Sequence, residues 1–294
     1  MANLGFIGLG LMGNPMCRNL IKGGHRLFVR DAEPQAMTPL TDLGATGCKT
    51  CREVLDSTDV VFIVVPDTPD VADVLFGPGG AAVQPAPGKI IVDMSSISPL
   101  DTKDFALRLA ERGMQMLDAP VSGGEVGAES GTLSIMVGGS AEVLAQVRPY
   151  LELMGNTITH IGDHGAGQTA KVANQIIVAL NLEAICEALL FASKAGADPE
   201  RVRKALMGGA ANSRLLEIKG EWILSRRFQP GFRVKHQQKD LNNALNAARK
   251  LGLMLPNTAT TQELYNAVSG DGGSDLDHCA VILALERMAN HKVT

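Results

Sequence analysis

A glycine-rich segment near the start of the chain constrains the fold more than any other feature. Residues 8–13 read GLGLMG, a G-x-G-x-x-G pattern that follows a short apolar run and opens an amphipathic segment at residues 12–21. A strand, a glycine turn and a helix in this order begin a dinucleotide-binding fold. In that fold Gly8 permits the tight turn, Gly10 lets the backbone approach a pyrophosphate, and Gly13 allows close packing of helix on strand.

Short apolar runs alternate with amphipathic segments through the first half of the chain. The strands expected from these runs are residues 4–7, 27–29, 60–65, 89–92, 114–117, 134–137 and 159–161. Strands that alternate with helices lie parallel, so we expect an α/β Rossmann domain with a doubly wound, mostly parallel sheet over residues 1–163. The run VVFIVV at residues 60–65 has no polar alternation, as expected of a strand covered on both faces.

From residue 164 the pattern changes to helical periodicity, which predicts an all-α domain over residues 164–294. Its first helix is expected at residues 168–195, roughly 40 Å long at 1.5 Å per residue. This helix is apolar on most sides, so we expect it to be buried by other helices, those of a second subunit included. Its polar residues are too many for a membrane-spanning helix, and no membrane partner is expected.

Composition excludes several classes of function. Apolar residues make up 45% and charged residues 20% of the chain, as in folded globular proteins. The net charge is -4 without a run of Lys and Arg, so no nucleic-acid partner is expected. Five cysteines, an odd number, indicate reduced thiols and a cytoplasmic protein, and no cleaved leader is expected. Cys48 and Cys51 form a C-x-x-C without a second Cys/His pair, which favours a turn and helix start over a redox or metal site.

The residue expected to select the cofactor follows the second strand. Asp31 lies 18 residues beyond Gly13, close to the spacing of about 20 residues at which a carboxylate binds the adenine ribose. Its charge would repel a 2′-phosphate, so NAD(H) is preferred. Arg30 beside it would pair with that phosphate, which keeps NADP(H) possible, and a plain turn residue at Asp31 is the alternative.

Two more loops follow expected strands, at the edge where open α/β sheets bind their ligands. One contains Val65 and Pro66; the other contains Ser95 and Ser96, whose hydroxyls would reach the nicotinamide half of the cofactor or cap the next helix. The predicted cofactor-binding residues are Gly8, Leu9, Gly10, Leu11, Met12, Gly13, Asp31, Val65, Pro66, Ser95, Ser96 and Lys239.

Two segments carry the candidate chemistry. Ser122, Gly123 and Gly124 combine a hydroxyl with two exposed amides, which suits a substrate carboxylate unless the segment is only a flexible loop. Lys171 and Asn174 are three residues apart near the start of the long helix and therefore share a face. A lysine in a buried cleft needs a task, and we assign it proton transfer to a carbonyl oxygen as hydride arrives, with a lysine reaching solvent as the alternative.

Four motifs in order resemble one family. Residues 5–16, 118–124, 167–175 and 239–241 read GFIGLGLMGNPM, DAPVSGG, GQTAKVANQ and KDL. Over essentially its whole length the chain resembles the β-hydroxyacid dehydrogenases, the 3-hydroxyisobutyrate dehydrogenase family. Within it the chain is most similar to the bacterial tartronate semialdehyde reductases, also called 2-hydroxy-3-oxopropionate reductases, which make D-glycerate in glyoxylate metabolism.

The resemblance implies a role for each candidate residue. Lys171 would be the catalytic acid and base, and the substrate-binding residues would be Ser122, Gly123, Gly124, Asn174 and Lys239. It also implies a homo-dimer or homo-tetramer built on the helical domain, and chemistry on a short semialdehyde without a metal. Another short semialdehyde such as that of 3-hydroxyisobutyrate, an imine substrate, and a dinucleotide-binding sensor without turnover are the alternatives.

Two positions depart from the pattern of these reductases. His236 and Gln237 stand where Leu-His is usual, which leaves the contacts of Lys239 open. Ala210 and Ala211 stand where related enzymes often have a bulkier residue. Both changes bear on the choice of substrate more than on the reaction.

Overall fold

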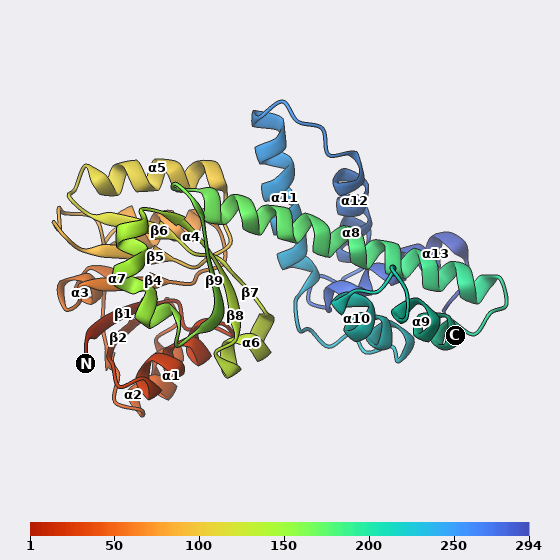
Figure 1. The fold of residues 1–294 in the computed structure, drawn as a ribbon, viewed down its shortest axis with the longest axis horizontal. Coiled ribbons are helices and arrows are strands. Elements are labelled where there is room, and N and C mark those ends of the chain that lie inside the picture. The colour runs from red at the N-terminus through yellow and green to blue at the C-terminus, as the bar shows by residue number, and fades with distance from the viewer. Residues whose placement is uncertain (294) are drawn as a thin grey trace. The chain divides into compact units, whose positions relative to one another are not determined.

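The computed structural model describes residues 1–293 and divides into two compact units, Met1–Lys171 and the chain from Val172 onward (Figure 1). Helix α8 (Ala166–Lys194) contributes its first turns to the first unit and the remainder to the second. The domain boundary placed after residue 163 stays a prediction.

A mostly parallel sheet forms the centre of the first unit. Its strands are β1 (Asn3–Ile7), β2 (Arg26–Arg30), β3 (Thr46–Gly47), β4 (Val60–Ile63), β5 (Ile90–Asp93), β6 (Gln115–Asp118), β7 (Val121–Ser122), β8 (Leu133–Gly139) and β9 (Gly155–Gly162). Their order is β3-β2-β1-β4-β5-β6-β8-β7, with β9 paired to β8. Among these pairs β8 is antiparallel to β6 and β7, and the others are parallel. The expected fold class is confirmed.

Helices cover both faces of this sheet, which is why consecutive strand residues are both apolar. Phe6 and Phe62 belong to one buried cluster, whereas Ile7 and Ile63, the next residues along β1 and β4, belong to the other. The helices are α1 (Gly13–Lys22), η1 (Pro34–Met37), α2 (Thr38–Thr41), α3 (Cys51–Asp56), α4 (Thr68–Phe76), α5 (Pro99–Ala110), α6 (Gly124–Ser130) and α7 (Ala141–Leu151). A sheet buried on both sides explains the unbroken run of β4.

Two details of the strands differ from expectation. β4 ends at Ile63 instead of residue 65, because the Val65 amide donates to the Ser95 hydroxyl in the next loop and not to a neighbouring strand. The two-residue strands β3 and β7 were not predicted, since runs this short carry no periodicity.

The second unit is helical. After α8 it contains α9 (Pro199–Met207), α10 (Arg214–Leu224), α11 (Val234–Lys250), α12 (Pro256–Gly270), η2 (His278–Ala280) and α13 (Val281–Ala289). Its core gathers apolar side chains from α8, α10, α11, α12 and α13, with Tyr265 among the largest fully buried residues.

Within this chain helix α8 is buried along one face, and burial of its other face by a second subunit stays a prediction. Ala179, Leu182 and Leu189 are fully buried, whereas Ile177 is 68% and Phe191 76% exposed. By length and composition alone α8 would suffice to cross a membrane, a test that core helices of soluble proteins also pass, and 39% of its most apolar window is buried.

Candidate active site

The glycine-rich loop adopts the geometry that its pattern predicts. Gly8 has φ of +93° and lies so close to the Val64 carbonyl that no Cβ would fit. A Cβ on Gly13 would overlap the carbonyl oxygen of Gly8, so the start of α1 packs tightly on β1. Around Gly10, by contrast, nothing lies within 4 Å of the position of a Cβ. The loop therefore has an open backbone at the one glycine expected to face a pyrophosphate.

Asp31 is tied to this loop. Its Oδ2 accepts a hydrogen bond of 2.6 Å from the Leu9 amide, and its Oδ1 accepts one of 2.9 Å from the Glu33 amide. The carboxylate keeps further lone pairs on both oxygens, so ribose hydroxyls remain suitable donors. The carboxylate thus links the end of β2 to the glycine loop.

A hollow of about 640 Å³ lies beside the loop. Its lining residues come from the loop, α1 and α6, and they are Leu9, Gly10, Leu11, Asn14, Pro15, Arg18, Asn19, Lys22, Glu125 and Glu129. Of the predicted cofactor contacts, Leu9, Gly10 and Leu11 are thus gathered at one hollow.

Of the two serines in the loop after β5, Ser95 stabilises the conformation of the loops. It is 2% exposed, and its hydroxyl accepts the Val65 amide at 3.0 Å. Ser96 is half-buried and Pro66 is exposed. The structure therefore joins the loops after β4 and β5 through Ser95, and direct contact of these residues with a cofactor stays a prediction.

The segment expected to bind the substrate carboxylate forms the end of β7 and the start of α6. Ser122 is half-buried, whereas Gly123 and Gly124 are exposed and have φ of +136° and +63°. Positive φ values strongly favour glycine at both positions. The two glycines are therefore required by the backbone, whatever their role toward a ligand.

Lys171 lies 8% exposed near the start of α8. The backbone amides of Gly165 and Gln168, about one turn before Lys171, donate to the Asp118 carboxylate at the end of β6, each at 2.8 Å. Burial raises the pKa of Asp118, and these backbone hydrogen bonds counteract part of that rise. Sequence reasoning assigned no role to Asp118 or Gln168, although Asp118 stands at the end of an expected strand, where polar residues often serve a site.

In the second unit Lys239 pairs with its neighbour. Its Nζ lies 3.0 Å from Oδ1 of Asp240, whose Oδ2 accepts a hydrogen bond of 2.5 Å from Gln175 of α8. Asp240 is 5% exposed and so links α11 to α8. Asn174, the residue before Gln175, has a buried Oδ1 without a hydrogen-bond partner in residues 1–293, which suits a ligand that donates a hydrogen bond.

The two departures from the reductase pattern lie in different surroundings. Gln237 is fully buried, its Oε1 lies 3.3 Å from Nδ1 of His278, and its Nε2 donates to the Gln175 carbonyl at 3.5 Å. Ala210 and Ala211 are exposed between α9 and α10. Gln237 therefore contributes to the packing of α11 on α8.

The C-x-x-C is a turn leading into a helix. Burial raises the pKa of both the Cys48 and the Cys51 thiols, and Glu53 adds to the rise at Cys48. Because the thiolate is the reactive and metal-binding form, this environment disfavours redox or metal chemistry. In the described part of the chain no group of three or more His, Cys, Asp or Glu is arranged to hold a metal.

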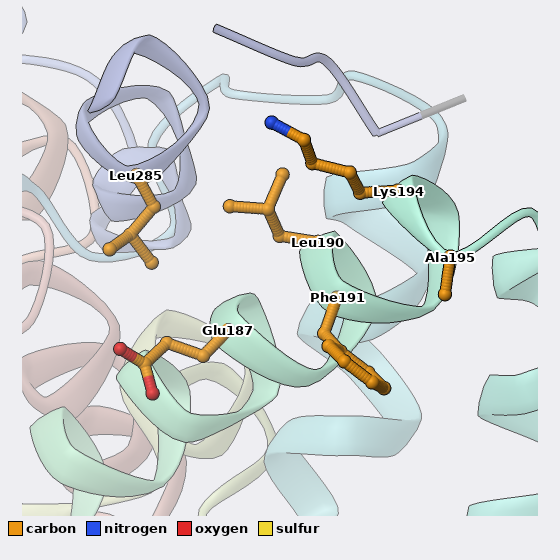
Figure 2. A pocket seen from close by; sticks show the side chains of 6 residues that line it. All are labelled: Glu187, Leu190, Phe191, Lys194, Ala195 and Leu285. Carbon is orange, nitrogen blue, oxygen red and sulfur yellow. The ribbon is translucent and has the colours of Figure 1, made fainter. Parts of the chain in front are cut away.

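A second hollow, of about 540 Å³, lies in the helical unit (Figure 2). It is lined by Glu187, Leu190, Phe191, Lys194 and Ala195 of α8 and by Leu285 of α13. The lining is mostly apolar and holds none of the predicted site residues.

Comparison with known proteins places the chain in a family. Residues 3–162 match the NAD binding domain of 6-phosphogluconate dehydrogenase, and residues 165–285 match the NAD-binding model of NADP-dependent 3-hydroxyisobutyrate dehydrogenase. The 2-hydroxy-3-oxopropionate reductase of Escherichia coli (strain K12) is 59% identical over 290 residues, 99% of each chain. The chain belongs to the 3-hydroxyisobutyrate dehydrogenase family of β-hydroxyacid dehydrogenases.

Other members of this family agree in sequence and in fold. The 3-hydroxyisobutyrate dehydrogenase of Pseudomonas aeruginosa is 36% identical over 90% of this chain and 92% of its own length. The structure of Mycobacterium tuberculosis 3-hydroxyisobutyrate dehydrogenase with L-serine has a TM-score of 0.87 at 32% identity, covering 97% of this chain and 99% of that one. The family resemblance read from the four motifs is confirmed, and the chain contains NAD(P)-binding domains.

Proposed function

We propose that this protein is a 2-hydroxy-3-oxopropionate reductase that converts tartronate semialdehyde to D-glycerate with NAD(P)H. The observation that carries the proposal is the 59% identity over 99% of each chain with the E. coli enzyme of that name. A buried lysine at the expected position supports it, since Lys171 is 8% exposed. A dinucleotide-binding sensor would need no such lysine.

The open backbone at Gly10 fits the pyrophosphate of a dinucleotide, and Asp31 fits its adenine ribose. When bound, the reduced nicotinamide supplies a hydride to the aldehyde carbon. Lys171 donates a proton to the carbonyl oxygen, and its positive charge stabilises the alkoxide as that charge develops. Ser122 with the amides of Gly123 and Gly124 would hold the substrate carboxylate. We assign further substrate contacts to Asn174 and Lys239 from the family resemblance.

The test is a steady-state assay in which tartronate semialdehyde is reduced with NADH and with NADPH. Changing Lys171→Ala should lower kcat by about 10²–10⁴-fold or more, because a general acid contributes that much, while the Kd of NADH changes little. Lys250→Ala, at an exposed lysine at the end of α11, is the control. Wild-type turnover in the Lys171 variant would reject the proposed role.

A second substrate deserves the same assay because the family also contains 3-hydroxyisobutyrate dehydrogenases, one of them 36% identical to this chain. The two semialdehydes differ by a methyl and a hydroxyl group, which change only a few contacts in a pocket. A preference of about tenfold or more for the methyl-bearing semialdehyde, worth about 1.4 kcal/mol, would replace the first choice of substrate. Turnover of imines alone would replace the reaction class.

We further propose NAD(H) as the preferred cofactor, no metal requirement, a cytoplasmic location and a homo-dimer or homo-tetramer. The exposed apolar residues Ile177 and Phe191 on α8 support the oligomer, because association with a second subunit would remove their side chains from water. Sedimentation velocity should show an assembly that Phe191→Glu weakens. A wild-type monomer at micromolar concentration would contradict this part of the proposal.

A further inference from the structure

Gln168 is the most tightly held polar side chain in the first turn of α8. It is fully buried, its Oε1 accepts the Ile97 amide at 3.1 Å, and its Nε2 donates to the Ser95 carbonyl at 2.7 Å. Because a backbone amide only donates and a carbonyl only accepts, these partners fix which end of the side-chain amide is oxygen. The side chain thus bridges α8 to the backbone of the loop after β5 in one orientation.

Two other features fix the same turn of helix to the sheet. Asp118 accepts the backbone amides of Gly165 and Gln168, as described above. A Cβ on Gly167 would lie 2.6 Å from the Asp118 carbonyl oxygen and closer still to the Met136 carbonyl oxygen. At Gly167 the helix backbone therefore lies directly against the backbone of β6 and β8, beside the Asp118 carboxylate. Neither sliding nor rotation of this turn is possible without breaking buried hydrogen bonds.

The bridge extends through Ser95 to a third element. The Ser95 carbonyl oxygen accepts from Nε2 of Gln168, and the Ser95 hydroxyl accepts from the Val65 amide of the loop after β4. One glutamine side chain thus sets the start of α8 relative to two loops at the carboxyl edge of the sheet. Apolar packing would hold these elements together as firmly, but a satisfied buried amide also fixes direction and register.

Lys171 follows Gln168 by three residues, so the two side chains leave α8 on the same face, one turn apart. Any shift of the Gln168 turn moves Lys171 by a similar amount relative to Ser96 and the rest of that loop. A displacement of about 1 Å of a catalytic group can lower a rate by about 100-fold.

We propose that Gln168 is a positioning residue for the reaction: its two hydrogen bonds to the loop after β5 set the place of Lys171 above the sheet edge. The inference rests on the proposed function, in which Lys171 transfers the proton. It assigns Gln168 no contact with substrate or cofactor.

The first test is Gln168→Met, which keeps the volume of the side chain and removes both hydrogen bonds. We expect kcat per folded active site to fall about 10- to 100-fold, while KM for the semialdehyde changes less than about threefold. Gln146→Met, at an exposed glutamine of α7 in the same unit, is the matched control and should leave both constants unchanged. Titration of NADH binding counts the folded sites, so poor folding does not obscure kcat.

The second test is Gln168→Glu, which separates positioning from simple loss of packing. The ionised carboxylate still accepts the Ile97 amide but repels the Ser95 carbonyl, whereas the protonated form donates to that carbonyl and restores both bonds. The kcat of this variant divided by that of wild type should therefore rise severalfold as pH falls from about 8 to about 5.5, since burial raises the pKa of the new carboxyl. Asp118, whose carboxylate binds the same turn, and His164 beside it are present in both proteins, so the ratio isolates the effect of the new carboxyl.

The outcomes are decisive in combination with Lys171→Ala. If kcat of Gln168→Met stays within twofold of wild type, or if the ratio for Gln168→Glu is flat with pH, the positioning role is wrong. If Lys171→Ala itself retains wild-type turnover, the proposed function fails, whatever the Gln168 variants do. A loss of kcat in Gln168→Met together with the pH-dependent recovery in Gln168→Glu supports the proposal.

Discussion

The two units hold their buried polar groups in different ways. In the first unit carboxylates bind backbone amides: Asp31 accepts the Leu9 amide and Asp118 accepts those of Gly165 and Gln168. In the second unit buried charges mostly bind other side chains, as in the Lys219–Asp277 pair at 2.7 Å. The Leu9, Gly165 and Gln168 amides lie 22 to 50 residues from their carboxylates, so both arrangements join positions that meet only in the folded protein. They differ in the partner, which is a backbone dipole in the first unit and a charged side chain in the second.

The Lys219–Asp277 pair shows what the second arrangement requires. Asp277 is fully buried, and besides Lys219 it accepts the amides of Gly231, Phe232 and Cys279. Burial alone would raise its pKa, but the charges of His278 and Lys219 and these hydrogen bonds outweigh it, and the pKa lies below its usual value. The ammonium of Lys219 also lies 3.6 Å from the centre of the Trp222 ring. Such a pair tolerates the loss of neither partner.

The largest effect is expected where the first unit relies on close backbone contact. Gly167→Ala should destabilise the protein by about 4 kcal/mol or more, or prevent folding, because overpacking against backbone has no relief. Gly270→Ala in α12, where nothing lies within 4 Å of the new Cβ, is the control in the second unit and should be nearly neutral. Thermal unfolding followed by circular dichroism measures both variants. Equal stability of the two would contradict the claim that close backbone contact makes Gly167 intolerant of a Cβ.

The next effect tests the charge pair of the second unit. Asp277→Asn should lower the free energy of unfolding by about 3 kcal/mol, because it leaves a buried Lys219 without a counter-charge. Asp275→Asn removes an equal charge from an exposed carboxylate that pairs with Arg233 and Lys235, and should change stability little. Urea unfolding followed by the fluorescence of Trp222, the single tryptophan, reports on this unit. Equal losses in the two variants would show that burial does not decide the strength of the pair.

A third prediction concerns pH. Burial lowers the pKa of His278 to about 4, against about 6.5 in an unfolded chain. The unfolded chain therefore binds the proton first, so the contribution of a neutral His278 to stability is present above pH 6.5 and is lost as pH falls toward 4.

Between pH 7 and pH 5 wild type should lose about 2 kcal/mol more than His278→Gln. Glu183 acts in the opposite direction in this range, because burial and Glu187 raise its pKa to about 7, but it is present in both proteins. The measurement is urea unfolding at both pH values. An identical pH dependence of the two proteins would mean that His278 is not buried in its neutral form.

The smallest effect returns to the first unit. Asp31→Ala should lower the ratio of kcat/KM with NADH to kcat/KM with NADPH by about tenfold, because the charge that repels a 2′-phosphate is lost. Glu33→Ala removes a nearby exposed charge and is the control. Steady-state rates with both cofactors give the ratio. An unchanged ratio would indicate that Arg30, and not Asp31, determines the preference between NADH and NADPH.

Features encoded by short sequence patterns were within reach of sequence reasoning. The glycine loop, Asp31 and the parallel strands were predictable because each is encoded by neighbouring residues, and the structure gives Gly8, Gly10 and Gly13 the surroundings that the pattern implies. The family was predictable from four local motifs. The roles of the individual site residues stay predictions.

Long-range contacts were beyond such reasoning. Gln168 and Ser95 are 73 residues apart, and Gln175 and Asp240 are 65 apart, so no local sequence pattern predicts either hydrogen bond. The sequence also did not show which face of α8 this chain leaves exposed, because an apolar helix has the same composition whether its own chain or another one covers it.

Each of the two units contains at least one fully buried cysteine. Cys17 in the first unit and Cys186 and Cys279 in the second are fully buried, and burial raises the pKa of all three thiols. Such thiols react with an alkylating reagent only when the surrounding helices open. Pulsed alkylation followed by peptide mapping would therefore time the opening of each unit separately, without any label introduced into the protein.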